Sequence, residues 1–199
     1  MLSLKNSLAV LRKTDALLEG HFVLSSGLHS PIYIQCAKLL SYPNLWKKIC
    51  LSLSKKIKKN FKNIDLILSP AMGGIIIGYE IGKLLNKETI FAERVKGKFI
   101  LRRGFKIKKK SRVLIIEDVI TTGKSSLECV KLINKSKGKL LGFASIIDRS
   151  NSKSLKIKGK KIISQIKINV PSYTKKNLPN SLRQIPITTP GSRYIWWQD

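Results

Sequence analysis

The chain has 199 residues, enough for one domain with a substantial core and too few for two independent ones, so we expect a single domain over residues 1–199. Lysine and arginine number 39 against 11 aspartate and glutamate, a formal net charge of +28, but the lysines are spread through almost every segment and no RNA-binding signature occurs, so we expect no specific nucleic-acid partner. The three cysteines lack CxxC spacing and no apolar run approaches about 18 residues, which argues against a disulfide framework, a zinc site, secretion and a membrane span, and favours a cytoplasmic protein.

The N-terminal segment 1–40 is predicted to contain a helix and a hairpin. Apolar residues at helical spacing predict an amphipathic helix over residues 3–18. Its apolar stripe consists of Leu4, Leu8, Leu11 and Leu18. Two β-prone runs follow, 22–24 and 32–34, and Gly27 gives the turn between them conformational freedom. These runs predict a β-hairpin.

Residues 44–59 resume the helical period. Their predicted inward-facing residues are Leu45, Ile49, Leu53 and Ile57. From residue 64 onward, strands and helices alternate. The predicted strands are 64–68, 88–92, 112–116, 140–147 and 161–168, and the predicted helices are 74–85 and 124–135. Such alternation predicts an α/β fold with a parallel sheet covered by helices on both faces, in which ligands bind outside the carboxyl ends of the strands.

The residue types that commonly hold metals do not form a recognisable site. His21 and His29 make no HExxH-type pair, so we expect each to be a surface or hairpin residue. Cys129 lies in a helical apolar pattern, which predicts that it packs in the core. We therefore expect no dedicated protein metal site.

The most informative segment is 112–126, an apolar strand that ends in Glu117 and Asp118 and leads into a turn rich in glycine and hydroxyls. Backbone N–H groups at a helix N-terminus favour a phosphate, and the carboxylates before it can accept hydrogen bonds from sugar hydroxyls. The end of this segment mimics a Walker A loop, but that motif needs a glycine where Asp118 stands, so we reject a P-loop. The alternative is an ordinary capped turn, which would not require two adjacent acids.

The segment resembles the loop of type I phosphoribosyltransferases that binds phosphoribosyl pyrophosphate (PRPP). The resemblance implies that a continuous run of residues binds PRPP. These residues are Glu117, Asp118, Val119, Ile120, Thr121, Thr122, Gly123, Lys124 and Ser125. Lys124 departs from the family pattern, which usually has a small or uncharged residue at this position.

A second loop, residues 69–74, follows the predicted strand 64–68 and contains Gly73 and Gly74. Glycines before a helix permit close backbone approach to a pyrophosphate. The loop resembles the pyrophosphate loop of the same family, although many members carry a lysine where Gly73 stands, so the backbone of Gly73 would have to bind PRPP. Close packing of a helix on the sheet is the alternative explanation.

The basic segment 94–110 alone would be interpreted as a solvated loop. It also resembles the mobile lid of orotate phosphoribosyltransferases, whose cations reach the pyrophosphate in the neighbouring subunit's site. The resemblance implies a homodimer that shares the lid, with Arg94 and Lys98 as catalytic, PRPP-binding cations. The histidine often found in this lid is absent.

The predicted strand 140–147 leads into Asp148 and Arg149. An arginine can hold a carboxylate through two parallel hydrogen bonds, and orotate carries a carboxylate that adenine, hypoxanthine and uracil lack. The pair resembles the orotate-binding pair of orotate phosphoribosyltransferases, whereas in isolation a strand-end Asp-Arg is more often a local salt bridge.

The N-terminal hairpin resembles the hood that covers orotate in those enzymes, with Ser26 and Gly27 matching the family pattern. The run 185–192 resembles the ending of one bacterial branch. The resemblance covers nearly the whole chain and implies a type I phosphoribosyltransferase-like fold with an N-terminal hood. The orotate-binding residues it implies are Ser26, Gly27, Thr121 and Arg149.

The resemblance implies that orotate and PRPP react to give orotidine 5′-monophosphate and pyrophosphate, a step of pyrimidine (UMP) synthesis. Asp118 is expected to act in catalysis beside the lid cations, and a Mg²⁺ ion is expected to be held mainly through PRPP. Two alternatives stay open: transfer to a different base, and a regulator that senses PRPP on the same fold while binding nucleic acid.

Overall fold

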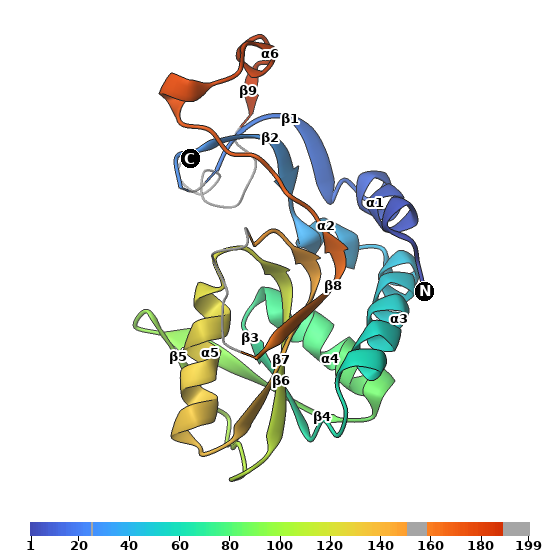
Figure 1. Cartoon of the computed structure of the whole chain (residues 1–199), viewed down its shortest axis with the longest axis vertical. Helices are drawn as coiled ribbons and strands as arrows, with labels where there is room; N and C mark the ends of the chain where they lie inside the picture. The colour runs from blue at the N-terminus through green and yellow to red at the C-terminus, as the bar shows by residue number, and fades with distance from the viewer. Residues whose placement is uncertain (25, 151–158, 189–199) are drawn as a thin grey trace, which may run out of the picture.

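The computed structural model describes residues 1–24, 26–150 and 159–188, which form two sheets. The larger sheet has six strands in the order β5-β4-β3-β6-β7-β8, and the smaller has three in the order β2-β1-β9. In Figure 1 the smaller sheet lies on the side of the molecule toward which β6, β7 and β8 point, which is the carboxyl edge of the larger sheet.

The predicted parallel sheet is confirmed. Its strands are β3 (Leu66–Pro70), β4 (Glu88–Val95), β5 (Lys98–Leu101), β6 (Arg112–Ile120), β7 (Lys139–Asp148) and β8 (Lys161–Lys167). All neighbouring pairs are parallel except β4 and β5, which form an antiparallel hairpin. The prediction missed β5 because its residues lie inside the basic segment 94–110, where the charge obscures the alternation of Phe99 and Leu101 with polar or exposed neighbours.

Helices cover both faces of this sheet, as the alternation predicted (Figure 1). They are α3 (Pro43–Asn60) and α4 (Gly73–Leu85) on one face and α5 (Lys124–Lys135) on the other. Side chains of β6 alternate between the two layers: Leu114 belongs to the same buried cluster as Ile49 of α3, whereas Ile115 belongs to the cluster that contains Cys129 of α5. The core prediction for Cys129 is confirmed, and Gly78 lets α4 approach the sheet, since a Cβ there would lie 2.2 Å from Ser69 Oγ.

The predicted helix over 3–18 is wrong beyond residue 13. Helix α1 (Leu4–Lys13) begins at the N-cap Ser3 and ends at Thr14, whose hydroxyl donates to the carbonyl oxygens of Val10 and Leu11. The next residue, Asp15, has a φ of 53°, so the chain reverses and enters a strand. Leu4, predicted to face inward, is 52% exposed.

The predicted hairpin is confirmed with longer strands, β1 (Leu17–Val23) and β2 (His29–Ile34). Strand β9 (Ile187–Thr188) adds to the outer side of β1 in parallel. The short elements α2 (Cys36–Leu40), η1 (Lys175–Asn177) and α6 (Asn180–Arg183) were not predicted. The second half of the run 185–192 that resembles a bacterial ending, residues 189–192, lies outside the described residues.

Both histidines lie in the hairpin, as expected, but they do not lie at its surface. His21 and His29 are buried, with 2.7 Å between His21 Nε2 and His29 Nδ1. The second ring nitrogen of His21, Nδ1, donates to the Ile185 carbonyl oxygen at 3.1 Å. The pair therefore ties the C-terminal segment to the hairpin. Within the described residues no helix is long and apolar enough to cross a membrane.

Candidate active site

Glu117 stands at the carboxyl end of β6, buried at 6% exposure. Its Oε1 accepts a hydrogen bond from the Ser126 hydroxyl of α5, a side chain that is itself fully buried. Burial raises the pKa of Glu117 to about 7, because desolvation disfavours the charged form and the Asp118 charge adds to this, while the Ser126 hydrogen bond opposes it. Nothing in the sequence indicated the role of Ser126, since a strand end, a turn and the first turn of α5 separate it from Glu117.

Asp118 is less buried than Glu117 and lies against the start of α4. Its Oδ1 accepts from the backbone N–H of Val119 at 2.9 Å, and burial raises its pKa above the ordinary value. A Cβ added to Gly73 would lie 2.5 Å from Asp118 Oδ2. A larger residue at Gly73 would therefore displace the carboxylate. The structure thus brings together Gly73 and Asp118, two residues predicted to bind the same ligand.

The turn between β6 and α5 exposes polar groups at the N-terminus of a twelve-residue helix. Thr121, Thr122 and Lys124 are exposed, and Gly123, at the N-cap, has a φ of 73°, a left-handed conformation that favours glycine. The Lys124 N–H lies 3.4 Å from Thr122 Oγ1, a long contact that leaves this donor available to a ligand. This turn can accept an anion.

Arg149 follows β7 directly beside the end of β6, where its N–H donates to the Ile120 carbonyl oxygen at 2.8 Å. Asp148 does not pair with it: the Asp148 carboxylate is buried and accepts from the N–H and hydroxyl of Ser150. Burial lowers the pKa of Arg149, and no described acid lies within ion-pair distance of its guanidinium. A partly desolvated arginine of this kind is suited to an external carboxylate.

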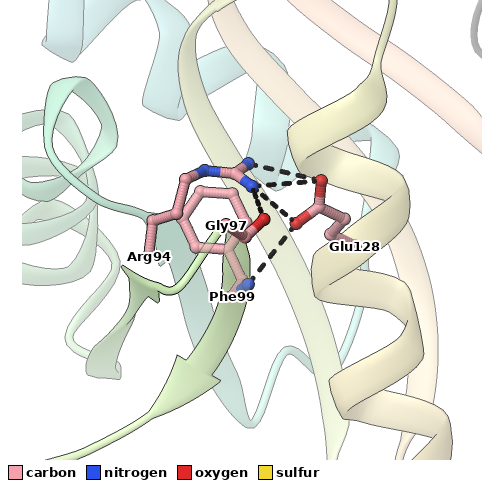
Figure 2. Close-up of polar contacts among 4 residues, drawn as sticks. All are labelled: Arg94, Gly97, Phe99 and Glu128. Atoms are coloured by element: carbon pink, nitrogen blue, oxygen red, sulfur yellow. Dashed lines mark hydrogen bonds and ion pairs between the residues drawn. The ribbon is translucent and has the colours of Figure 1, made fainter.

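The two predicted lid cations lie on the β4–β5 hairpin, and Arg94 is already engaged there. Figure 2 shows its guanidinium donating to both Glu128 oxygens, with Nη1 3.1 Å from Oε2, and to the carbonyl oxygen of Gly97. The same group stacks over the Phe99 ring, 4.1 Å from its centroid. Sequence reasoning missed Glu128, which lies 34 residues away on α5.

Lys98 is exposed, as Arg94 is, but unlike Arg94 it has no ion pair with any described residue. Ser26 and Gly27 belong to the separate β1–β2 hairpin, in its exposed turn, where Gly27 has a φ of 77°. No hydrogen bond within the described part of the chain joins them to Thr121 or Arg149. The structure therefore unites the residues at the ends of β3, β6 and β7, and leaves the hairpin residues outside that group.

The carboxylates of the site also bear on metal binding. The described residues contain no grouping of three or more His, Cys, Asp or Glu that could hold a metal ion. Glu117 and Asp118 nevertheless supply the hard oxygen donors that Mg²⁺ prefers, and this ion is commonly bound through one or two carboxylates together with substrate phosphates. The residues present fit a metal ion that arrives with a phosphorylated ligand.

Comparison with known proteins identifies the family to which the chain belongs. Residues 38–175 match the phosphoribosyl transferase domain family. The chain is 45% identical over 184 residues to the orotate phosphoribosyltransferase of Parvibaculum lavamentivorans, covering 92% of this chain and 94% of the relative. It is 44% identical over 186 residues to that of Caldicellulosiruptor saccharolyticus, covering 94% and 95%.

Solved structures show the same fold. The orotate phosphoribosyltransferase from Aeropyrum pernix superimposes with a TM-score of 0.70 at 23% identity, covering 80% of this chain and 92% of that one. The adenine phosphoribosyltransferase from Thermoanaerobacter pseudethanolicus gives a TM-score of 0.59 at 18% identity, covering 69% and 88%. Because proteins named for two different bases share this architecture, the fold does not decide the base.

Proposed function

The chain belongs to the orotate phosphoribosyltransferases of the phosphoribosyl transferase family, and we propose that it transfers the 5-phosphoribosyl group of PRPP to orotate. The products are orotidine 5′-monophosphate and pyrophosphate, in the synthesis of UMP. The observation that carries this proposal is the meeting of the Glu117–Asp118 pair with Arg149 at one edge of the sheet.

Each group at this edge has a task in the reaction. The bond from ribose C1 to the pyrophosphate oxygen breaks and a bond from C1 to N1 of orotate forms, so positive charge develops on the ribose while negative charge grows on the leaving group. Glu117 and Asp118 accept hydrogen bonds from the ribose hydroxyls and thereby fix the sugar. The carboxylate of Asp118, directly beside the Gly73 backbone, is also proposed to stabilise the developing positive charge.

The phosphate and base ends of the substrates bind on either side of these acids. The turn from Thr121 to Ser125 donates N–H and hydroxyl groups to the 5′-phosphate at the positive end of α5. Arg149 holds the orotate carboxylate through two parallel hydrogen bonds, and Thr121, the first residue of the turn, is proposed to contact orotate as well. Mg²⁺ fits the acid pair and would bring positive charge to the pyrophosphate oxygens when it is bound with PRPP.

The cations of the β4–β5 hairpin are proposed to act on the pyrophosphate of a neighbouring subunit, as a lid over residues 94–110. A second copy has a surface to dock on: Met72, Ile76 and Tyr79, on and just before one face of α4, are 84%, 48% and 65% exposed. This face begins beside Gly73, so a partner docked on it would lie close to the site. The β1–β2 hairpin is proposed to act as the hood over orotate through Ser26 and Gly27.

Two features bear on the remaining proposals. The three cysteines are free and buried, which suits a reducing cytoplasm.

A different base is the second candidate function, because adenine phosphoribosyltransferases share the fold. Arg149 favours orotate over it, since the other common bases carry no carboxylate for a partly buried guanidinium. The intact acid pair argues against a regulator that only senses PRPP.

The proposal is tested by incubating purified protein with PRPP, Mg²⁺ and one base at a time, and following the base by its absorbance and pyrophosphate by a coupled assay. We expect turnover of orotate and none of adenine, hypoxanthine or uracil. Turnover of another base, with none of orotate, would overturn the assignment.

A further inference from the structure

An ion pair between Glu128 and Arg94 joins α5 to the β4–β5 hairpin (Figure 2). We propose that Glu128 competes with pyrophosphate for Arg94, so that binding of the pyrophosphate group exchanges one anion for another at this guanidinium. This inference rests on the proposed function, in which Arg94 binds the pyrophosphate of a neighbouring subunit, and adds to it a residue that sets the affinity for that group.

The contacts of Arg94 divide between its own hairpin and α5. The Gly97 carbonyl oxygen accepts a hydrogen bond from Arg94 Nη1, and the Phe99 ring lies against the guanidinium, 4.1 Å away at its centroid. Both of these contacts lie within the hairpin. Among the described residues, only Glu128 pairs with Arg94 from another element. Loss of the Glu128 contact therefore leaves the guanidinium anchored beside the turn of the hairpin and makes its charge available to another anion.

The pair between Glu128 and Arg94 is looser than a comparable pair elsewhere in the chain. Its three N–O distances are 3.1, 3.3 and 3.4 Å, whereas Arg112 contacts the two oxygens of Asp65 at 2.7 and 2.9 Å. Charge-assisted N–H to O hydrogen bonds at full strength measure about 2.7 to 2.9 Å. The Oε2 atom of Glu128 also accepts from the Phe99 N–H, at 3.4 Å. Because pyrophosphate carries more negative charge than one loosely held carboxylate, it is able to displace Glu128.

The pair also lies where an anion can reach it. The side chain of Arg94 is 38% exposed and that of Glu128 is 18% exposed, whereas Phe99, which packs in the same buried cluster as Cys129 of α5, is only 6% exposed. The buried ring therefore keeps the hairpin on α5 while the charged groups above it exchange partners. Glu128 is the single acid in the sequence of α5, in a chain with 39 basic and 11 acidic residues. One of these few acids thus faces a cation proposed to bind pyrophosphate.

The exchange weakens the binding of pyrophosphate and eases its release. A ligand that binds Arg94 must first displace Glu128, so its apparent affinity is reduced by the fraction of molecules in which the pair is formed. When pyrophosphate leaves, the guanidinium returns to a carboxylate. Pyrophosphate is both a product and a part of PRPP, so we expect Glu128 to affect the binding of both.

The experiment compares Glu128→Gln with Glu19→Gln in the purified protein. Glu19 pairs with Arg12 at 2.7 Å, between exposed side chains of α1 and β1. This control makes the same chemical change, breaks an arginine pair and adds the same unit of net charge outside the proposed site. Isothermal titration calorimetry with inorganic pyrophosphate and Mg²⁺, at fixed ionic strength, measures the dissociation constant, and steady-state kinetics with PRPP varied give KM and kcat. The calorimetry is repeated with Glu128→Gln in an Arg94→Ala background.

We expect Glu128→Gln to bind pyrophosphate about two- to fivefold more tightly than wild type, the size expected when a competing exposed ion pair is lost, and to lower the KM for PRPP by a similar factor. The value of kcat should not rise, because a more tightly bound product leaves no faster. Glu19→Gln should keep the wild-type constants. In the Arg94→Ala background, Glu128→Gln should have little further effect, because Glu128 acts through Arg94.

Unchanged or weaker binding of pyrophosphate by folded Glu128→Gln would overturn the inference, as would an equal gain in Glu19→Gln or a gain that persists without Arg94. The proposed function fails separately: wild-type protein that binds pyrophosphate but does not turn over orotate would refute the activity, while the calorimetry would still decide whether Glu128 competes for Arg94.

Discussion

The carboxyl end of β6 and the β4–β5 hairpin both carry charged residues proposed to act on PRPP, but they hold those residues in opposite ways. At the end of β6, Glu117 is held by a hydroxyl from α5 in a buried position, and the burial raises its pKa. On the hairpin, Arg94 is fixed by an ion pair and a ring on the surface. The difference teaches that the ribose acids are pre-organised at a cost in stability, whereas the pyrophosphate cations are held by contacts that can be exchanged.

The largest effect on activity is expected from a change to the acids at the end of β6. Asp118→Asn preserves the shape of the side chain and removes the charge beside Gly73. We expect kcat/KM for PRPP to fall by at least about 100-fold with an unchanged circular dichroism spectrum. The matched control is Asp65→Asn, the same change at the opposite end of the sheet, where Asp65 pairs with Arg112 and should leave kcat/KM intact. Equal activity of Asp118→Asn and wild type would remove Asp118 from the site.

The stability cost can be measured through Glu117→Gln. The pKa of Glu117 is raised from 4.5 to about 7 in the folded protein, so the folded state binds more protons than the unfolded state between these values. Wild-type stability therefore falls as the pH rises through this window, and the variant escapes that loss. In urea denaturation we expect the two proteins to differ little near about pH 4.5, and the variant to be more stable by up to about 3 kcal/mol above about pH 7.

A constant difference at all pH values would show that Glu117 is not strained by its burial. The acids at the end of β6 would then not differ from the hairpin cations in their cost to stability.

Arg149→Ala tests the base end of the same edge. The lost contact is charge-assisted and worth about 1.5 to 3 kcal/mol, so the KM for orotate should rise about 10- to 150-fold while the KM for PRPP changes little. Arg149→Lys keeps the charge without the paired geometry and should recover only part of the loss. Steady-state kinetics with each substrate varied in turn distinguish this outcome from a structural role, which would raise both constants together.

The smallest effect is expected on stability, from removing the ion pair between Arg94 of the hairpin and Glu128. Glu128→Gln removes the ion pair to Arg94 but keeps an acceptor for the Phe99 N–H. Because the Arg94 side chain is 38% exposed, the free energy of unfolding should fall by only about 0.2 to 1 kcal/mol, and by less in high salt. Urea denaturation at two ionic strengths measures this. If the free energy of unfolding instead fell by several kcal/mol and salt did not reduce the loss, Arg94 would be held as firmly as the buried acids.

Much of this arrangement could be predicted from the sequence, because period-two and helical patterns dominate wherever a segment faces the core. Strand β6 and helix α3 emerged from their apolar spacing, and the acids of β6 from their place at a strand end. Helix α1 was predicted too long because Leu18 fits the helical stripe, while the left-handed backbone of Asp15 that ends the helical run has no signature in apolar spacing.

The partners of the site residues could not be predicted. The hydrogen bond from Ser126, the ion pair to Glu128 and the contact of His21 with His29 each join side chains on two different elements. Apolar periodicity reports which face of an element is buried and does not report which polar group lies opposite it.

The central claim is that the two halves of a working site come from different subunits: the acids from one and the hairpin cations from its partner. The most direct test mixes Lys98→Ala, which removes a hairpin cation, with Asp118→Asn, which spoils the ribose site, after each has been shown to be inactive alone. In a mixed dimer, one site combines the intact acids of the first variant with the intact hairpin of the second. Half the dimers are mixed at equilibrium and each has one competent site in two, so we predict recovery of up to about a quarter of wild-type orotate turnover. No recovery, despite demonstrated subunit exchange, would contradict the claim.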